Sequence, residues 1–292
     1  MKKYSSILLL LLLTTGFSHA QKSCCSMSSS TTMAFADLGN EKAFVASHLA
    51  PLPLDFQAEI GKMLSLKTTD GKETKIFEVK SGPSQGKVIL MFHEWWGLND
   101  YIKREAERLH KETGFTVIAM DLYDGQVATN PDDAGKMMQS MKDDRARAII
   151  TAALDYVGKF GKVQTIGWCM GGGWSLQAAI MAGQQGYGAV MYYGMPEKDQ
   201  AKLAQIQGPV LGIFAKKDQW ITPEVVTQFE ADMKTAGKTL TVVNYDADHA
   251  FANPSNPKYM KAFSEEAHAK VLAFVKKNFE GPLRPAVVPA EK

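Results

Sequence analysis

The residues with the clearest chemical potential lie at Gly167–Gly172, where the sequence reads Gly-Trp-Cys-Met-Gly-Gly. This is the pattern glycine-x-nucleophile-x-glycine, in which a strand turns sharply into a helix. The central residue takes strained backbone angles, and glycines on either side leave room for the turn. Val163–Ile166 is typical of a short strand and Trp174–Met181 of a helix. A thiol near a helix N-terminus, which favours its thiolate, indicates that Cys169 is a nucleophile.

A nucleophile of this kind needs a base, and the base needs an orienting acid. A strand predicted at Val210–Phe214 leads into Asp218, and a strand predicted at Leu240–Tyr245 leads into His249. Each could be an ordinary loop residue, and Cys169 could be a buried core cysteine. The order nucleophile, acid, histidine, each just past a strand, indicates a catalytic triad instead.

The other five histidines fit the role of base less well. His110 and His268 lie within predicted helices, His48 precedes the sheet, and His19 is expected to leave with a signal peptide. His93 ends a strand, but it precedes the nucleophile in the chain and so has the wrong order.

The loop His93–Gly97 follows a predicted strand at Val88–Phe92. A second oxyanion-hole donor is expected at this place, so the backbone N–H groups of Trp95 and Met170 are the candidates. Glu94 is either a solvated loop residue or a carboxylate that accepts a hydrogen bond from the thiol. Its apolar and aromatic neighbours favour the second interpretation.

Strands and helices alternate along most of the chain, which predicts an α/β fold with a mostly parallel central sheet and helices on both faces. Asp70-Gly71 predicts a hairpin turn between the first two strands. Besides the strands named above, we expect strands at Leu64–Thr69, Lys75–Val79, Phe115–Ala119 and Ala189–Tyr193. Besides the helix after Cys169, we expect helices at Tyr101–Glu112, between Asp132 and Lys159, and at Lys198–Gln205, Pro223–Ala236 and Lys258–Phe279.

The N-terminus has the features of a secretory signal peptide. Lys2 and Lys3 precede the apolar run Ile7–Leu13, and Ser18-His19-Ala20 supplies small residues for cleavage near Ala20. We therefore expect export to a bacterial periplasm or beyond, without a membrane anchor in the mature chain. The predicted organisation is a signal peptide (1–20), a flexible leader (21–50), one domain (51–280) and a flexible tail (281–292).

The composition excludes one class of partner. The 292 residues carry a formal net charge of +2 without a dense basic cluster, which argues against nucleic acid as a partner. Three cysteines are an odd count, so at least one thiol is unpaired; the role of the adjacent Cys24 and Cys25 stays open. A monomer is expected.

Five motifs together resemble the dienelactone hydrolase (carboxymethylenebutenolidase) family between about Met63 and Phe279. They are His93–Asn99, Asp121–Tyr123, Gly167–Gly172, Lys217-Asp218 and His249–Ala252. The resemblance implies a single α/β-hydrolase domain without metal or organic cofactor. It also implies a Cys169–His249–Asp218 triad, with Glu94 helping to generate the thiolate, and an acyl-cysteine intermediate. Trp96, Tyr123 and Phe251 are then expected to line the substrate pocket.

Two positions depart from the family pattern. The well-studied dienelactone hydrolases hold the substrate carboxylate with two arginines, and the matching positions here are Gly125 and Asn253. The residues therefore predict a hydrolase of carboxylic esters, with a neutral ester, lactone or thioester as good a candidate as a dienelactone. A non-catalytic homologue that binds a small ligand is the alternative from another class. A thiol peptidase or acyl transferase also remains open.

Overall fold

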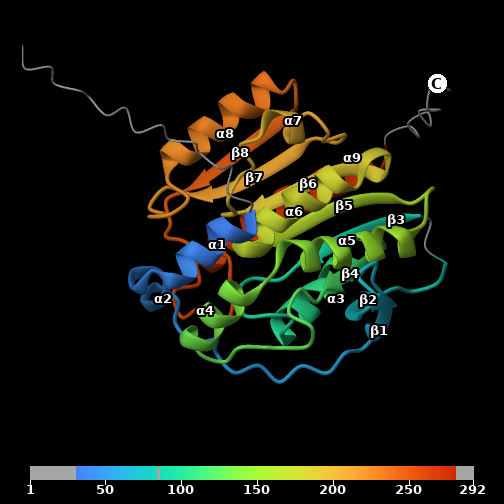
Figure 1. The fold of residues 1–292 in the computed structure, drawn as a ribbon, viewed down its shortest axis with the longest axis horizontal. Coiled ribbons are helices and arrows are strands. Elements are labelled where there is room, and N and C mark those ends of the chain that lie inside the picture. The colour runs from blue at the N-terminus through green and yellow to red at the C-terminus, as the bar shows by residue number, and fades with distance from the viewer. Residues whose placement is uncertain (1–30, 84–85, 281–292) are drawn as a thin grey trace, which may run out of the picture.

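The computed structural model describes residues 31–83 and 86–280, so the expected signal peptide, Cys24, Cys25 and the tail 281–292 lie outside the described residues. An eight-stranded sheet with the order β1-β2-β4-β3-β5-β6-β7-β8 forms the centre (Figure 1). Strands β3 to β8 are parallel, and the hairpin β1–β2 runs antiparallel at one edge. The strands are β1 (Lys62–Lys67), β2 (Glu73–Val79), β3 (Lys87–Phe92), β4 (Thr116–Met120), β5 (Lys162–Trp168), β6 (Gly186–Tyr192), β7 (Val210–Ala215) and β8 (Leu240–Tyr245).

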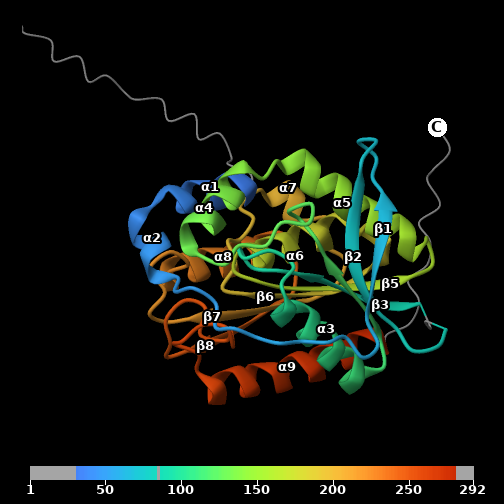
Figure 2. The same ribbon diagram turned by 90° about the horizontal axis from the view of Figure 1, so that it is seen from below.

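Helices cover both faces of the sheet, as the alternating pattern predicts. Helices α3 (Asp100–Thr113) and α9 (Lys261–Phe279) lie on one face (Figure 2). The other face carries α5 (Asp143–Val157), α6 (Met170–Met181) and α8 (Pro223–Thr235), with α4 (Pro131–Ser140) and the short α7 (Gln200–Leu203) beside them. This is the α/β-hydrolase fold, so the predicted fold class is confirmed. Among residues 31–83 and 86–280, no helix is both long and apolar enough to cross a bilayer.

Two predicted helices differ in extent from the observed ones. The single helix expected between Asp132 and Lys159 is divided into α4 and α5, because Met141 takes an extended backbone (φ −62°, ψ 133°) and ends the first. The helix expected at Lys198–Gln205 is reduced to α7, whose first turn is capped by the carboxylate of Asp199.

The segment before β1 differs from the flexible leader expected at 21–50. Its described part forms helices α1 (Thr31–Asn40) and α2 (Lys42–Ser47), which lie beside α4 and α6 (Figure 1). Phe35 and Phe44 are completely buried. These apolar side chains gain stability from burial that a solvated leader would not provide, on the order of 1.5–3 kcal/mol each.

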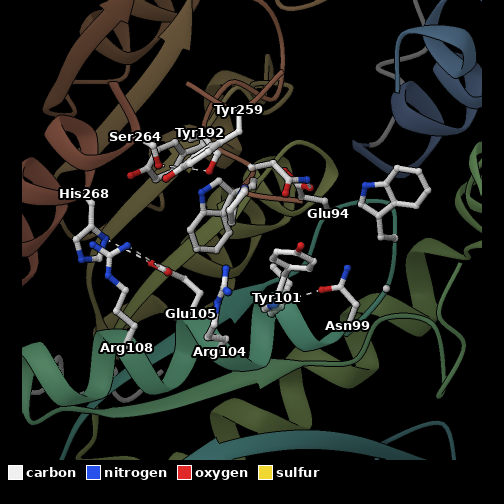
Figure 3. Close-up of a pocket in the computed structure, with 17 residues that line it drawn as sticks. Glu94, Asn99, Tyr101, Arg104, Glu105, Arg108, Tyr192, Tyr259, Ser264 and His268 are labelled. Carbon is white, nitrogen blue, oxygen red and sulfur yellow. Dashed lines mark hydrogen bonds and ion pairs between the residues drawn. The ribbon is translucent and has the colours of Figure 1, made fainter. Parts of the chain in front are cut away.

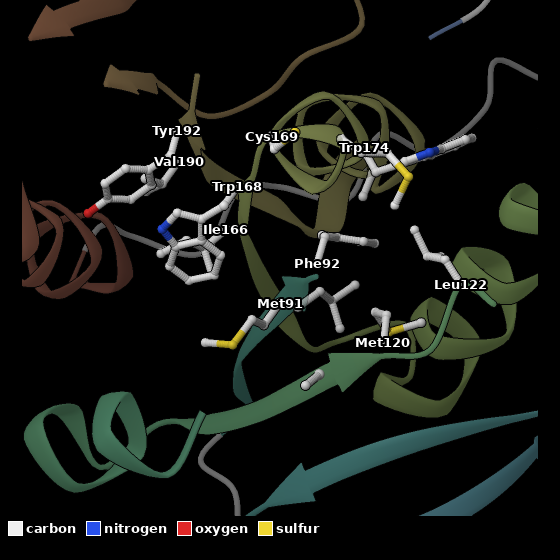
Figure 4. Packing of buried hydrophobic residues seen from close by; sticks show 14 of the residues in the cluster. Met91, Phe92, Met120, Leu122, Ile166, Trp168, Cys169, Trp174, Val190 and Tyr192 are labelled. Atoms are coloured by element: carbon white, nitrogen blue, oxygen red, sulfur yellow. The ribbon is translucent and has the colours of Figure 1, made fainter. Parts of the chain in front are cut away.

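The central strands determine where the functional loops meet. β3 is a nearly continuous apolar run and β5 is buried along almost its whole length, as expected for strands covered on both faces. The two strands pair so that Phe92 lies opposite Gly167. Both strands therefore end at the same edge. Large buried side chains pack around Cys169 at this edge, with Phe92 and Trp168 beneath it and Trp174 beside it (Figure 4).

Candidate active site

Cys169 lies at the turn between β5 and α6. Its backbone angles (φ 54°, ψ −122°) are in a region that residues with a Cβ atom rarely adopt. The glycines of the motif are required by contact: a Cβ on Gly167 would lie 2.0 Å from the carbonyl oxygen of Gly171, and one on Gly171 would lie 2.3 Å from that of His93. The backbone N–H of Cys169 donates to the carbonyl oxygen of Tyr192 at 3.0 Å, which ties the turn to β6.

Asp218 and His249 form a buried pair at the ends of β7 and β8. Nδ1 of His249 donates to Oδ2 of Asp218 at 2.6 Å, and the two side chains are 5% and 0% exposed, respectively. Oδ1 of Asp218 accepts from the backbone N–H groups of Trp220 (2.9 Å) and Ile221 (3.0 Å). Burial alone would raise the pKa of Asp218, but the neighbouring imidazole and these hydrogen bonds lower it. The aspartate is therefore an ionised partner for the histidine.

The thiol and the imidazole of His249 lie close together. Sγ of Cys169 and one ring nitrogen each of His249 and His48 are all within 4.8 Å of one another. Nε2 of His249 has no hydrogen-bond partner of ordinary geometry among the described residues. Burial raises the pKa of the Cys169 thiol, whereas the neighbouring imidazole acts in the opposite direction. Burial lowers the pKa of His249, but Asp218 and then Cys169 outweigh it and raise that pKa well above its ordinary value.

Glu94 borders the same site. Its carboxylate accepts hydrogen bonds from the hydroxyl of Tyr193 (3.3 Å, at Oε1) and from the side-chain amide of Asn253 (at Oε2). Burial raises the pKa of Glu94 to about 7, although His249 and the two donors act against the shift. Glu94 is thus buried beside the thiol rather than solvated, and it changes charge near neutral pH.

The two candidate oxyanion-hole donors lie on either side of the thiol in the chain. The backbone N–H of Met170 interacts with the thiol and lowers its pKa. The N–H of Trp95 donates to no backbone or side-chain oxygen within the described part of the chain. Its indole belongs to the core, since Trp95 is completely buried.

Four aromatic rings surround His249, none of which the sequence assigned to the site. Their centroids lie 5.0 Å (Tyr193), 5.3 Å (His48), 5.9 Å (Trp220) and 6.1 Å (Phe44) from that of His249. Phe44 lies in α2, and His48 is the residue that follows this helix. Burial and the nearby His249 lower the pKa of His48 to about 3, so its ring is neutral at physiological pH. His93, by contrast, is a structural residue, with Nε2 accepting from the backbone of Leu122.

A cavity of about 260 Å³ opens next to Glu94 between α3 and α9, and we call it the α3–α9 cavity (Figure 3). Of the predicted pocket residues, Trp96 lines it. Tyr123 and Phe251 do not: the hydroxyl of Tyr123 donates to Sδ of Met170, and Phe251 packs against Tyr245. The cavity is lined by Glu94, Trp96, Gly97, Asn99, Tyr101, Ile102, Arg104, Glu105, Arg108, Trp168, Tyr192, Ala252, Asn253, Pro254, Tyr259, Ser264 and His268.

Gly125 and Asn253, the two positions at which the resemblance leads us to expect arginines, form other contacts in this structure. The backbone of Gly125 donates to Asp121, and Asn253 binds Glu94. An arginine does reach the first position from α5, but Arg145 is held there in ion pairs with Asp70 and Asp124.

Comparison with known proteins identifies the family. The model of the dienelactone hydrolase family matches residues 75–279. The chain belongs to this family. Protein usf of Aquifex pyrophilus is 31% identical over 204 residues, which cover 65% of this chain and 88% of that protein. The carboxymethylenebutenolidase of Pseudomonas putida is 26% identical over 229 residues, which cover 73% and 94% of the two chains.

Solved structures agree with the fold of the dienelactone hydrolase family. A dienelactone hydrolase-like promiscuous phosphotriesterase from metagenomic libraries superposes with a TM-score of 0.64 at 21% identity, covering 75% of this chain and 98% of the other. The matched family region begins after α1 and α2. His48 and Phe44 therefore enter the site from outside that region.

Proposed function

We propose that this dienelactone hydrolase homologue cleaves carboxylic esters or lactones through an acyl intermediate on Cys169. One observation carries the proposal: Asp218 holds Nδ1 of His249 at 2.6 Å, while the same imidazole lies within 4.8 Å of Sγ of Cys169. A nucleophile, a base and an orienting acid thus come together from the ends of three parallel strands.

The reaction follows from this geometry. Sγ attacks the carbonyl carbon while Nε2 of His249 takes the thiol proton, and Asp218 stabilises the resulting imidazolium. The N–H groups of Trp95 and Met170 are proposed to bind the oxyanion of the tetrahedral intermediate. His249 then gives its proton to the leaving oxygen, and the acyl-cysteine forms. Water, activated by the same imidazole, releases the acid and restores the thiol.

Glu94 is proposed to control the protonation of the thiol. Its charge raises the pKa of Cys169, so the loss of that charge near neutral pH makes the thiolate easier to form. A carboxyl group with a pKa of about 7 can also take and return a proton at the working pH. A resting thiol is then less exposed to oxidation than a free thiolate, which suits the export that the N-terminal sequence predicts.

A small activated ester tests the proposal. Cys169→Ala should abolish turnover without unfolding the protein, and wild-type protein quenched during turnover should carry the acyl mass on the peptide containing Cys169. Turnover that survives in Cys169→Ala, or an acyl group on a different residue, would refute it. Replacement of His249 by Gln should stop both acylation and release.

A further inference from the structure

Three potential metal ligands converge above the sheet edge. The donor atoms of His48, Cys169 and His249 all lie within 4.8 Å of one another, and all three side chains are buried. Such a group of one sulfur and two imidazole nitrogens is chemically distinct from an acidic cluster on a surface. His48 is supplied by the segment that follows α2, outside the family-matched residues 75–279.

The hydrogen bonds behind the two imidazoles determine which nitrogens face the thiol. Nδ1 of His48 donates to the carbonyl oxygen of Phe44 at 2.7 Å, and Nδ1 of His249 donates to Asp218 at 2.6 Å. Neither Nε2 has a hydrogen-bond partner of ordinary geometry among the described residues. One proton is left for Sγ and the two Nε2 atoms, whether it lies on the sulfur or on His249, so this buried centre has an excess of lone pairs.

The same arrangement is the usual environment of histidines that bind metals. A carboxylate or a backbone carbonyl that accepts from Nδ1 fixes the tautomer and directs Nε2 at the cation. Here His249 has a carboxylate behind it and His48 has a carbonyl. A tetrahedral zinc site places such sulfur and nitrogen donors about 3.3–3.7 Å apart, so small side-chain movements would close the observed triangle.

We propose that His48, Cys169 and His249 form a binding site for a borderline-soft divalent cation of the zinc class. The cation forms bonds to Sγ and to both Nε2 atoms, and the thiol proton is released to solvent, without any change of oxidation state. A fourth coordination position stays available for water. Because the cation occupies both the nucleophile and the base, the bound form is an inhibited form of the proposed hydrolase.

Cobalt is a suitable probe because a thiolate bound to Co²⁺ gives a charge-transfer band in the near ultraviolet. The full chain with Cys24→Ser and Cys25→Ser should bind one Co²⁺ with this band, and Zn²⁺ should displace it. Cys169→Ser should lose the band. His48→Ala should weaken binding about 100-fold or more, since loss of even an outer-shell partner commonly weakens metal affinity 10- to 100-fold.

His268→Gln is the matched control. His268 is also a buried histidine, and it contacts the carboxylates of Glu105 and Glu112, so it tests whether any histidine with acidic neighbours gives the signal. This variant should bind the metal as wild type does. Zn²⁺ should also raise the melting temperature of wild-type protein but not that of a folded His48→Gln variant.

Three results would overturn the metal site: no thiolate band, an affinity unchanged by loss of His48, or a signal that follows His268. Failure of this site is distinguishable from failure of the hydrolase, because binding is measured without turnover. A wild-type protein that hydrolyses esters but binds no metal would refute the site alone.

Discussion

The side-chain amide of Asn253 donates a hydrogen bond to the carboxylate of Glu94. The resemblance to the dienelactone hydrolases matches Asn253 to a position at which an arginine is expected. A neutral amide stabilises the ionised carboxylate much less than a guanidinium would, and burial therefore keeps the pKa of Glu94 at about 7. Burial thus sets the pH range in which Glu94 affects the thiol, and the contact with Asn253 moves that range to lower pH.

Substitution of Asn253 should move that range in a known direction. Asn253→Arg places a cation beside the carboxylate and should lower the pKa of Glu94 by at least about one unit, whereas Asn253→Ala should raise it. The pH dependence of kcat/KM for a neutral ester reports the shift. Profiles that move in the same direction in both variants would contradict the role assigned to this contact.

Glu94 should also make stability depend on pH. Its pKa is about 7 in the folded protein against an ordinary 4.5, so the folded state binds the proton more tightly. The resulting stabilisation, about 3 kcal/mol, is fully present below about pH 4.5 and is lost as the pH rises through about 7. The free energy of unfolding, measured with denaturant at several pH values, should therefore fall more steeply between about pH 4.5 and 7 in wild type than in Glu94→Gln. The exposed Glu230→Gln is the control and should follow wild type.

Phe44 should limit access to Cys169. Its ring lies against His48, Trp95 and Trp220, with centroids 4.3, 5.5 and 5.0 Å away. Phe44→Ala removes these contacts and loosens α2, so iodoacetamide should label Cys169 ~10-fold faster or more. Phe115→Ala is the control, because Phe115 packs edge-to-face against Phe279 instead. Equal acceleration in both variants would indicate general destabilisation and not opening of the site.

Arg104 tests whether the α3–α9 cavity, which borders Glu94, takes part in substrate binding. It projects from α3 into the α3–α9 cavity, where its guanidinium lies 5.0 Å from the ring of Tyr101 and has no ion pair with a described residue (Figure 3). Arg104→Gln should raise KM about threefold to tenfold for an ester with a free carboxylate and leave a neutral analogue unchanged. The neighbouring Lys103→Gln removes a cation already paired with Asp100. An equal rise of KM for the carboxylate-bearing ester in Lys103→Gln would show that the preference depends on net charge and not on Arg104.

The sequence predicts the sheet and the elbow because both depend on local pattern. Short segments rich in apolar and β-branched residues predict the strands. Parallel strands bring their carboxyl ends to one edge, which is why Asp218 and His249 lie together although 31 positions separate them. Tyr193 is the last residue of a predicted strand, so the same rule could have found it beside Glu94.

His48 could not be placed from the sequence in the same way. The spacing of Phe44 and His48 fits one helical face, but nothing in that spacing indicates which surface the helix covers. Its position depends on packing against Trp95 and Trp220, residues from two distant loops. The position of Arg104 in the α3–α9 cavity could not be predicted either. A helical pattern shows which face of a helix is polar, but it does not show that a cavity lies above that face.

The left-handed backbone at Cys169 affects how the protein can be stabilised by directed evolution. A residue with a Cβ atom at φ 54° and ψ −122° stores strain on the order of 1–3 kcal/mol, which glycine would relieve. Cys169→Gly is therefore expected to be inactive and yet as heat-resistant as wild type or more so. Screens that reward thermal stability alone would drift away from the thiol, so a stabilised variant has to be selected for heat resistance and turnover together.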